Sequence, residues 1–420
     1  MGRQMRSVLL LGLLATAVGV AAAQTSSPLT WEQVSRRFAQ NNPNLLAGRL
    51  NIEESKAQEI TAYLRPNPTT TLSVDQINPF PGGPPHSCCG ALLSVAAFSY
   101  LHEREHKREL RLESARQGTA MTVSSQADLE RTLLFSLRSA FVAVLQAKAV
   151  LQLAKDNLAY YDHVLELSRV RWKAGDIAQV DLDRLELQRV QYESDVETAQ
   201  VSLRTAKIAL LTLLNDRTAV EQFDVIGPFD FAEPPFSREE FRRIALENRP
   251  DLRAAVQAVE KARTDYKLAQ ANGSTDPTLG FDIGRNPPID QYFGFNVSLP
   301  LRLFDRNQGE KLRTRLDIAR NERLRDAAEA LVFSDVDSGY ATLMSTVNLL
   351  RPYRARYLQM SVRVRDTIAF SYQHGGASLL DFLNAESEYR AVQLNYVNLI
   401  GSYLTAAAQL NLAAGQEVIP

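Results

Sequence analysis

One five-residue segment carries the residue types of a zinc hydrolase. It is His102-Glu103-Arg104-Glu105-His106, an H-E-x-x-H pattern. On a helix this spacing presents two imidazoles to zinc and leaves the first glutamate as a general base. A catalytic site also needs a third ligand and a cleft that excludes water, whereas this segment continues into a charged run with Lys107 and Arg108. We therefore favour a solvated helix start over metalloprotease chemistry.

The two cysteines of the chain, Cys88 and Cys89, are adjacent and lie in a turn-rich stretch, residues 78–90. Adjacent cysteines rarely bond to each other without strain. Two loop thiols, or an intermolecular contact, are a better interpretation than a metal or redox site. The sequence contains no nucleophile-elbow, P-loop or dinucleotide-binding pattern. We expect no enzyme activity and no cofactor.

The charge balance argues against nucleic acid as a partner. The chain has 47 basic and 48 acidic side chains in 420 residues, for a formal net charge of −1. At the N-terminus, Arg3 and Arg6 precede an apolar run that ends at Ala21-Ala22-Ala23. This order is typical of a secretory signal peptide with an A-x-A cleavage site, and the apolar run is too short to span a bilayer.

Three residue types recur at a constant distance along the chain. Residues 174–186 and 374–386 share Gly, Asp and Glu at an offset of 200, and the pairs are Gly175 and Gly375, Asp181 and Asp381, and Glu186 and Glu386. Between Thr119 and Ile226 there is no proline and a single glycine. The sequence therefore predicts a long helical hairpin, made twice, with a tip at each glycine.

An apolar seam follows each tip. Alternating steps of three and four residues select apolar side chains after each glycine, and Arg189 is the one exception. A period of about 3.5 residues kept for this long is typical of helices packed lengthwise as a coiled coil. The positions are Leu182, Leu185, Arg189, Tyr192, Val196, Ala199, Leu203, Ala206, Leu210 and Leu213, then Phe382, Ala385, Tyr389, Val392, Tyr396, Leu399, Tyr403, Ala406, Leu410 and Ala413.

Both halves of the chain predict the same order of elements. A short capped helix leads through an Asn-x-Pro segment into an Ala-rich helix. A β-hairpin follows, because apolar residues alternate with polar or small ones. A long helix then runs from about His102, and its counterpart starts near Asp305 and is bent by Pro352.

These elements divide the chain into five parts. They are a signal peptide at 1–23, a first repeat at 24–216 with its β-hairpin at 69–101, a linker at 217–235, a second repeat at 236–415 with its β-hairpin at 277–303, and a tail at 416–420.

Four strands are too few to form a closed sheet. Their two open edges would leave N–H and C=O groups unpaired in hydrocarbon, so a membrane-embedded chain must oligomerise to close a barrel. The alternating aromatics Phe293 and Phe295 fit either a soluble sheet or a lipid-facing one. Together with the signal peptide, the strand count favours the membrane.

This combination resembles the TolC-type outer-membrane efflux protein family, and the resemblance covers essentially the whole mature chain. Its most specific piece is Tyr372-Gln373-His374-Gly375 with Asp381, echoed by Trp172-Lys173-Ala174-Gly175 with Asp181. The resemblance implies a mainly α fold with a small β part. Long coiled-coil hairpins and four strands per chain would build a homotrimer, with a twelve-stranded barrel in the outer membrane of a Gram-negative bacterium and an α-helical tunnel in the periplasm.

The resemblance also implies roles for the tips. Gly175, Asp176, Gly375 and Gly376 would contact a periplasmic adaptor that serves an inner-membrane pump.

A gate at the same end is implied as well. Asp181 would pair with Tyr372 in the closed state, and Asp381 would line the pore as a ring of three carboxylates that attracts cations. The family's second pore aspartate is here Asn384, and the arginine expected near the tip is Ala377. We therefore expect a gate that is looser or differently held.

The predicted function is the exit duct of a tripartite efflux system, passively conducting small solutes such as drugs or metal ions. One alternative is the exit duct of a type I protein secretion system, which would differ in its genomic neighbours. Another is a periplasmic coiled-coil scaffold or adaptor, which should lack the β-hairpins and stay soluble without detergent.

Overall fold

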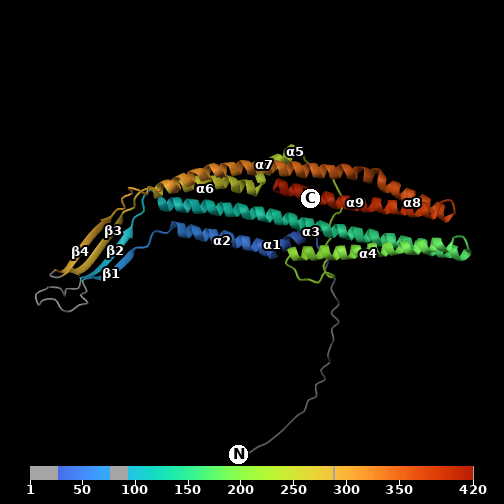
Figure 1. Cartoon of the computed structure of the whole chain (residues 1–420), viewed down its shortest axis with the longest axis horizontal. Helices are drawn as coiled ribbons and strands as arrows, with labels where there is room; N and C mark the ends of the chain where they lie inside the picture. Colours follow the sequence, from blue (N-terminus) through green and yellow to red (C-terminus); the bar gives the residue numbers. More distant parts are fainter. Residues whose placement is uncertain (1–26, 76–92, 287–288, 420) are drawn as a thin grey trace, which may run out of the picture.

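The protein is a long rod of helices with a small sheet at one end and both hairpin tips at the other (Figure 1). The computed structural model describes residues 27–75, 93–286 and 289–419. The predicted signal peptide and the pair Cys88 and Cys89 lie outside these ranges. The predicted fold class, mainly α with long hairpins and four strands, is confirmed.

Helices make up most of the described chain, and two short helices precede each β-hairpin. The helices are α1 (Trp31–Asn41), α2 (Pro43–Tyr63), α3 (Lys107–Ala174), α4 (Gln179–Leu213), α5 (Arg238–Asn248), α6 (Pro250–Asn272), α7 (Gln308–Pro352), α8 (Leu358–Gln373) and α9 (Leu379–Ala414). Capping boxes begin α1 and α5, with Thr30 and Ser237 as caps. Helix α3 has 68 residues and is therefore about 102 Å long.

The second long helix is interrupted where the first is not. Helix α7 ends at Pro352, and a π-helical turn, η1 (Tyr353–Tyr357), joins it to α8. Proline has no N–H to donate to the preceding turn, and π turns often mark a local adjustment of the helix. The α7–α8 arm is therefore interrupted by a π turn, whereas α3 is continuous.

The sheet joins the two halves of the chain. Its strands are antiparallel in the order β1 (Thr69–Asp75), β2 (Leu93–Leu101), β3 (Thr278–Asn286) and β4 (Ile289–Ser298). The central pairing between β2 and β3 sets Phe98 opposite Phe281, which is in turn opposite Phe295 on β4. Among the described residues, strands β1 and β4 each keep one unpaired edge.

One face of the sheet is apolar and exposed. Phe295 is 85% exposed and Leu72 is 78% exposed. The other face carries polar or small residues, including Ser73, Asp282 and Asn296. The exposed apolar side chains are Leu72, Val74, Phe98, Leu279, Phe281, Ile283, Phe293, Phe295 and Val297.

Four buried clusters line the described part of the helical rod, and the smallest of them lies between α3 and α4. One contains Phe141 and Leu210 and belongs to the first half, and a second contains Val336 and Leu410 and belongs mainly to the second half. The third cluster lies toward the tips and combines residues from α3, α4, α8 and α9. Helix α3 packs against α2, α4, α6 and α9, so it runs through the centre of the rod.

Candidate functional site

The two tips share one backbone turn. Gly175 ends α3 with φ +86° and Gly375 follows α8 with φ +74°, both in the left-handed region that glycine adopts without a steric cost. In each tip the following N–H returns to the helix end, from Asp176 to the Arg171 carbonyl at 2.9 Å and from Gly376 to the Ser371 carbonyl at 2.8 Å. All four predicted adaptor-contacting residues are exposed.

Asp381 caps the helix that follows the second tip. Its Oδ2 accepts hydrogen bonds from the Ser378 hydroxyl at 2.7 Å and the Ser378 N–H at 3.1 Å, while its own N–H donates to the Ser378 Oγ at 3.1 Å. These bonds hold the pKa of Asp381 below its usual value. The side chain is exposed, and Asn384 lies exposed one turn further along α9.

Tyr372 is buried and stacks on Phe382, with 5.1 Å between the ring centroids. Its hydroxyl makes no hydrogen bond in the part of the chain that the structure describes, so the predicted pairing with Asp181 is not formed within this chain. Burial raises the pKa of Tyr372, and the charge of Asp181 raises it further while that of Arg171 lowers it. Asp181 therefore lies within electrostatic range, at the start of α4.

Arg171 forms a contact between the two tips that the sequence did not predict. Its Nη1 donates to the Tyr372 carbonyl at 3.1 Å, and its guanidinium carbon lies 5.4 Å from the centroid of the Tyr372 ring. The residue stands four positions before Gly175 in the sequence, in the last turn of α3. The helix dipole favours a cation in the last turn of a helix. The position of Arg171 in the sequence was therefore a signal, but one that did not specify Tyr372 as its partner.

The H-E-x-x-H segment is not helical. Glu105 and His106 have φ values of +55° and +53°, and α3 begins only at Lys107, so the prediction of a helix from about His102 is wrong. The reason is a competing contact, since the Arg104 N–H donates to Asp276 Oδ1 at 3.0 Å. The two imidazoles therefore lack the helical spacing that a zinc site of this kind uses.

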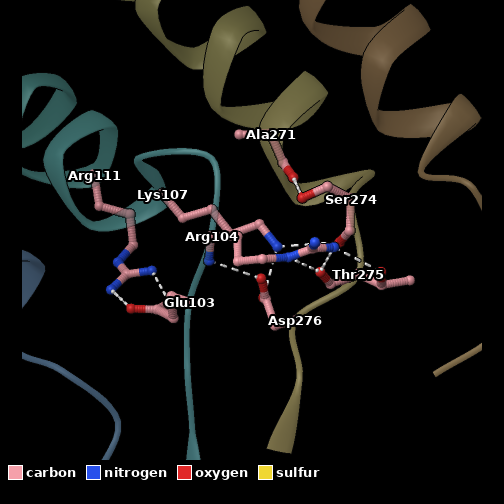
Figure 2. Close-up of polar contacts among 8 residues, drawn as sticks. All are labelled: Glu103, Arg104, Lys107, Arg111, Ala271, Ser274, Thr275 and Asp276. Carbon is pink, nitrogen blue, oxygen red and sulfur yellow. Dashed lines mark hydrogen bonds and ion pairs between the residues drawn. The ribbon is translucent and has the colours of Figure 1, made fainter. Parts of the chain in front are cut away.

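Lys107 is buried rather than solvated, at 3% exposure. Its Nζ donates to Asp276 Oδ2 at 2.6 Å and to the Ser274 carbonyl at 3.1 Å, as Figure 2 shows. Arg104 donates from Nε to the Thr275 carbonyl at 2.7 Å. These contacts join the chain leaving β2 to the chain entering β3, and so fix the sheet to the helical rod.

The described ranges contain no group of three or more His, Cys, Asp or Glu side chains placed to hold a metal ion.

Comparisons with known proteins agree with this architecture. Residues 242–416 match the family described as outer membrane efflux protein. The chain is 24% identical over 423 residues to the cobalt-zinc-cadmium resistance protein CzcC of Cupriavidus metallidurans, which covers 95% of this chain and 93% of that protein. It is 24% identical over 318 residues to the pyoverdine export outer membrane protein OpmQ of Pseudomonas aeruginosa, covering 73% and 66%.

Solved structures show the same fold. CusC matches with a TM-score of 0.76 at 18% identity over 92% of each chain. The outer membrane protein VceC of Vibrio cholerae matches with a TM-score of 0.75 at 16% identity over 92% of this chain and 96% of that one. The predicted outer-membrane location and efflux-channel function are confirmed. The predicted resemblance to the outer membrane efflux protein family is thus confirmed.

Proposed function

We propose that three copies of the chain close a twelve-stranded barrel in the outer membrane and continue it as a helical tunnel into the periplasm. The observation that carries this proposal is the four-stranded sheet, which has an exposed apolar face and, within the described part of the chain, two unpaired edges. In hydrocarbon each unpaired backbone group costs several kcal/mol, so the edges have to pair with those of neighbouring copies. Three chains of four strands supply a barrel of the predicted size.

The helical part supports the same assembly. Among the described helices, α3 has an 18-residue window apolar enough to cross a membrane by composition, yet 28% of that window is buried inside one chain. The core helix of a soluble protein passes the same composition test, but such a helix is mostly buried within its own chain. We infer that neighbouring copies cover this surface and that α3 belongs to the tunnel wall.

The division into two repeats follows from this arrangement. Each repeat would supply one β-hairpin and one helical hairpin, with the linker at 217–235 between them. Buried Phe223 and Val225 and the bridge between Val225 and Leu29 give that linker fixed contacts.

The exposed tips are the proposed docking site for a periplasmic adaptor that delivers solutes from an inner-membrane pump. The turns between α3 and α4 and between α8 and α9 lie at the end of the rod far from the sheet (Figure 1). They hold Gly175, Asp176, Gly375 and Gly376, which are exposed. The chain then acts as a passive duct with no catalytic step and no cofactor, and with outer-membrane lipid around its barrel. The near-zero net charge gives no support to nucleic acid as a partner.

The tips are also the proposed gate. Arg171 holds Tyr372 through the contacts described above, and Asp181, Asp381 and Asn384 lie near the same turns. Substituting Asp381 by Ala should weaken block of single-channel current by multivalent cations, because a ring of carboxylates attracts them. Unchanged block would remove Asp381 from the pore and leave it only the role of a helix cap.

The proposed cargo is small solutes, with divalent metal cations ahead of drugs. The support is the near-complete coverage of a relative named for cobalt, zinc and cadmium resistance. Deleting the gene should sensitise the host to these cations, and restoring it on a plasmid should reverse the effect. Sensitivity to organic drugs alone would reverse the order of the two cargo classes.

The assembly is tested on the purified mature protein in detergent. Light scattering should give the mass of three chains, and planar bilayers should show discrete single-channel steps. A monomer that stays soluble without detergent and gives no steps would contradict the proposal and favour a periplasmic scaffold.

A further inference from the structure

A buried carboxyl group lies behind the second tip. Glu386 on α9 is 3% exposed, and its Oε1 has no hydrogen-bond partner in the described part of the chain. None of the ion pairs among the described residues includes it. Burying an uncompensated charge is costly, so a carboxyl group in this position favours its neutral form.

Every helix around Glu386 contributes polar or charged neighbours. Burial raises the pKa of Glu386 to about 7, because the opposing effects of Arg365, Arg390 and Tyr160 are smaller. The surrounding titratable and charged groups are Tyr160 and Tyr161 on α3, Tyr192 and Asp195 on α4, Arg365, Asp366 and Tyr372 on α8, and Tyr389 and Arg390 on α9.

Arg390 has two carboxyl groups within its reach. Its Nη1 donates to Asp195 Oδ2 on α4 at 3.1 Å, and its guanidinium carbon lies 4.3 Å from the centroid of the Tyr192 ring, so it links the two helical hairpins. Its Nε has no partner among the described residues. Glu386 precedes Arg390 by four residues on α9, which is the favourable order for an ion pair on one helix.

We propose that Arg390 exchanges between Asp195 and Glu386 when α9 separates from α4, and that protonated Glu386 stabilises the closed arrangement. The inference rests on the proposed function of the tips as a gate. In the closed arrangement Arg390 holds the hairpins together and Glu386 stays neutral. In the open arrangement Glu386 is solvated, charged and paired with Arg390 on its own helix.

The direction of the pH dependence follows from proton binding. The closed state binds the Glu386 proton with a raised pKa, whereas the open state returns the group to an ordinary carboxyl value of about 4.3 or lower. The closed state therefore gains as pH falls below about 7, and opening gains as pH rises from about 4.3 to about 7 and then levels off. For one linked proton the ratio of open to closed changes about tenfold per pH unit in that range.

The first repeat supplies a matched control. Glu186 is the counterpart of Glu386 at the offset of 200, but it is exposed and accepts a hydrogen bond from Arg169 Nη2 at 2.9 Å. The position equivalent to Arg169 is Ala369, so Glu386 has no such partner on α8. Glu186 is thus exposed and paired with an arginine, while Glu386 is buried and forms no ion pair among the described residues.

The test measures open probability of the purified trimer in planar bilayers between about pH 5.5 and 8.5, a range that brackets the two protonation states. The wild-type channel should open more as pH rises. Glu386→Gln should remain at the acid level at every pH, and Glu186→Gln should keep the wild-type profile. Asp195→Asn should raise open probability throughout, because Arg390 loses its partner on α4. A wild-type profile in Glu386→Gln, or an equal change in Glu186→Gln, would overturn the proposal.

A second measurement does not depend on conduction or on a gating variant. Infrared difference spectra of the detergent-solubilised protein should show a protonated carboxyl band that titrates near pH 7 and is unchanged in Glu186→Gln. Its absence from the wild-type spectra would overturn the proposal even if the channel gates normally. Wild-type protein that never conducts would instead contradict the channel function, and the infrared result would still decide the protonation of Glu386.

Discussion

The two helical hairpin tips have the same turn but different supports. Both reverse direction through a glycine in the left-handed region. After the first tip, Ala178 stands at the cap position before α4 and offers no side-chain cap, whereas after the second tip Ser378 and Asp381 form a complete capping box. The second tip also places the aromatic Phe382 where the first has Leu182.

The difference shows how one repeated motif can serve two purposes. The shared glycine turn preserves the reversal of the chain, and the surrounding side chains then set how firmly each tip is held. The second tip receives the cap, the stacked aromatic pair and the buried Glu386, while the first tip supplies Arg171 as the contact to its neighbour. In a gate of this kind the second tip would be the more firmly held, and the first tip would contact it through Arg171.

The largest expected effect is on the aromatic support of the second tip. Phe382→Ala should lower its local stability by about 3–5 kcal/mol, because the ring is 1% exposed and its loss leaves a cavity beside Tyr372. Hydrogen-exchange protection of peptides covering residues 379–390 measures the change. Leu380→Ala is the control, since that side chain is 66% exposed and should cost less than about 0.5 kcal/mol. Equal losses in both variants would contradict the assigned packing.

Replacing the turn glycine should destabilise both tips equally. Gly175→Ala and Gly375→Ala should each cost about 1–2 kcal/mol, because an added Cβ is strained at positive φ although nothing lies within 4 Å of it. Gly309→Ala is the control, since its Cβ also meets open space and its φ is not positive. Urea unfolding of the detergent-solubilised variants gives the comparison. A cost at only one tip would break the equivalence of the two turns.

Exchanging the two cap residues should make the stabilities of the two tips more alike. Ser378→Ala should destabilise the second tip by about 1 kcal/mol. Ala178→Ser should stabilise the first by a similar amount, because Ala178 has φ −72° and ψ 152°, close to the −78° and 160° of Ser378, and Asp181 already stands at the third helical position. Hydrogen exchange in the first turns of α4 and α9 measures both. No gain in Ala178→Ser would mean that the cap is not what separates the tips.

The smallest expected effect is the acid dependence of the second tip. Hydrogen bonds from Ser378 lower the pKa of Asp381 in the folded protein, so its stabilising contribution is present above the ordinary value of about 4 and is lost as pH falls through the lowered pKa. The thermal midpoint of the wild-type protein should therefore decline more steeply below about pH 4 than that of Ser378→Ala. Parallel declines in the two proteins would assign the acid sensitivity to other groups.

Much of the architecture could be predicted from residue spacing. Leu182, Leu185 and Tyr192 are buried in the cluster near the tips, as the apolar period indicates, and the alternating residues of β3 and β4 form an exposed apolar face. The start of α3 could not be predicted, because the turn before it depends on Asp276, 169 residues beyond Lys107. A local sequence pattern does not reveal a contact with a residue so far along the chain.

The sequence by itself determined the periods, the turns and the number of strands, because helix and strand repeats and positive-φ glycines are local properties of the backbone. The tertiary structure alone decided which polar groups meet. Arg171 contacts Tyr372, and Glu386 is buried while Glu186 is not, because four helices pack together near the tips and cover positions that a single hairpin leaves in water. The rotation of these helices about their axes and their shift along one another follow from packing across the whole cluster. A repeat within one segment does not encode that packing.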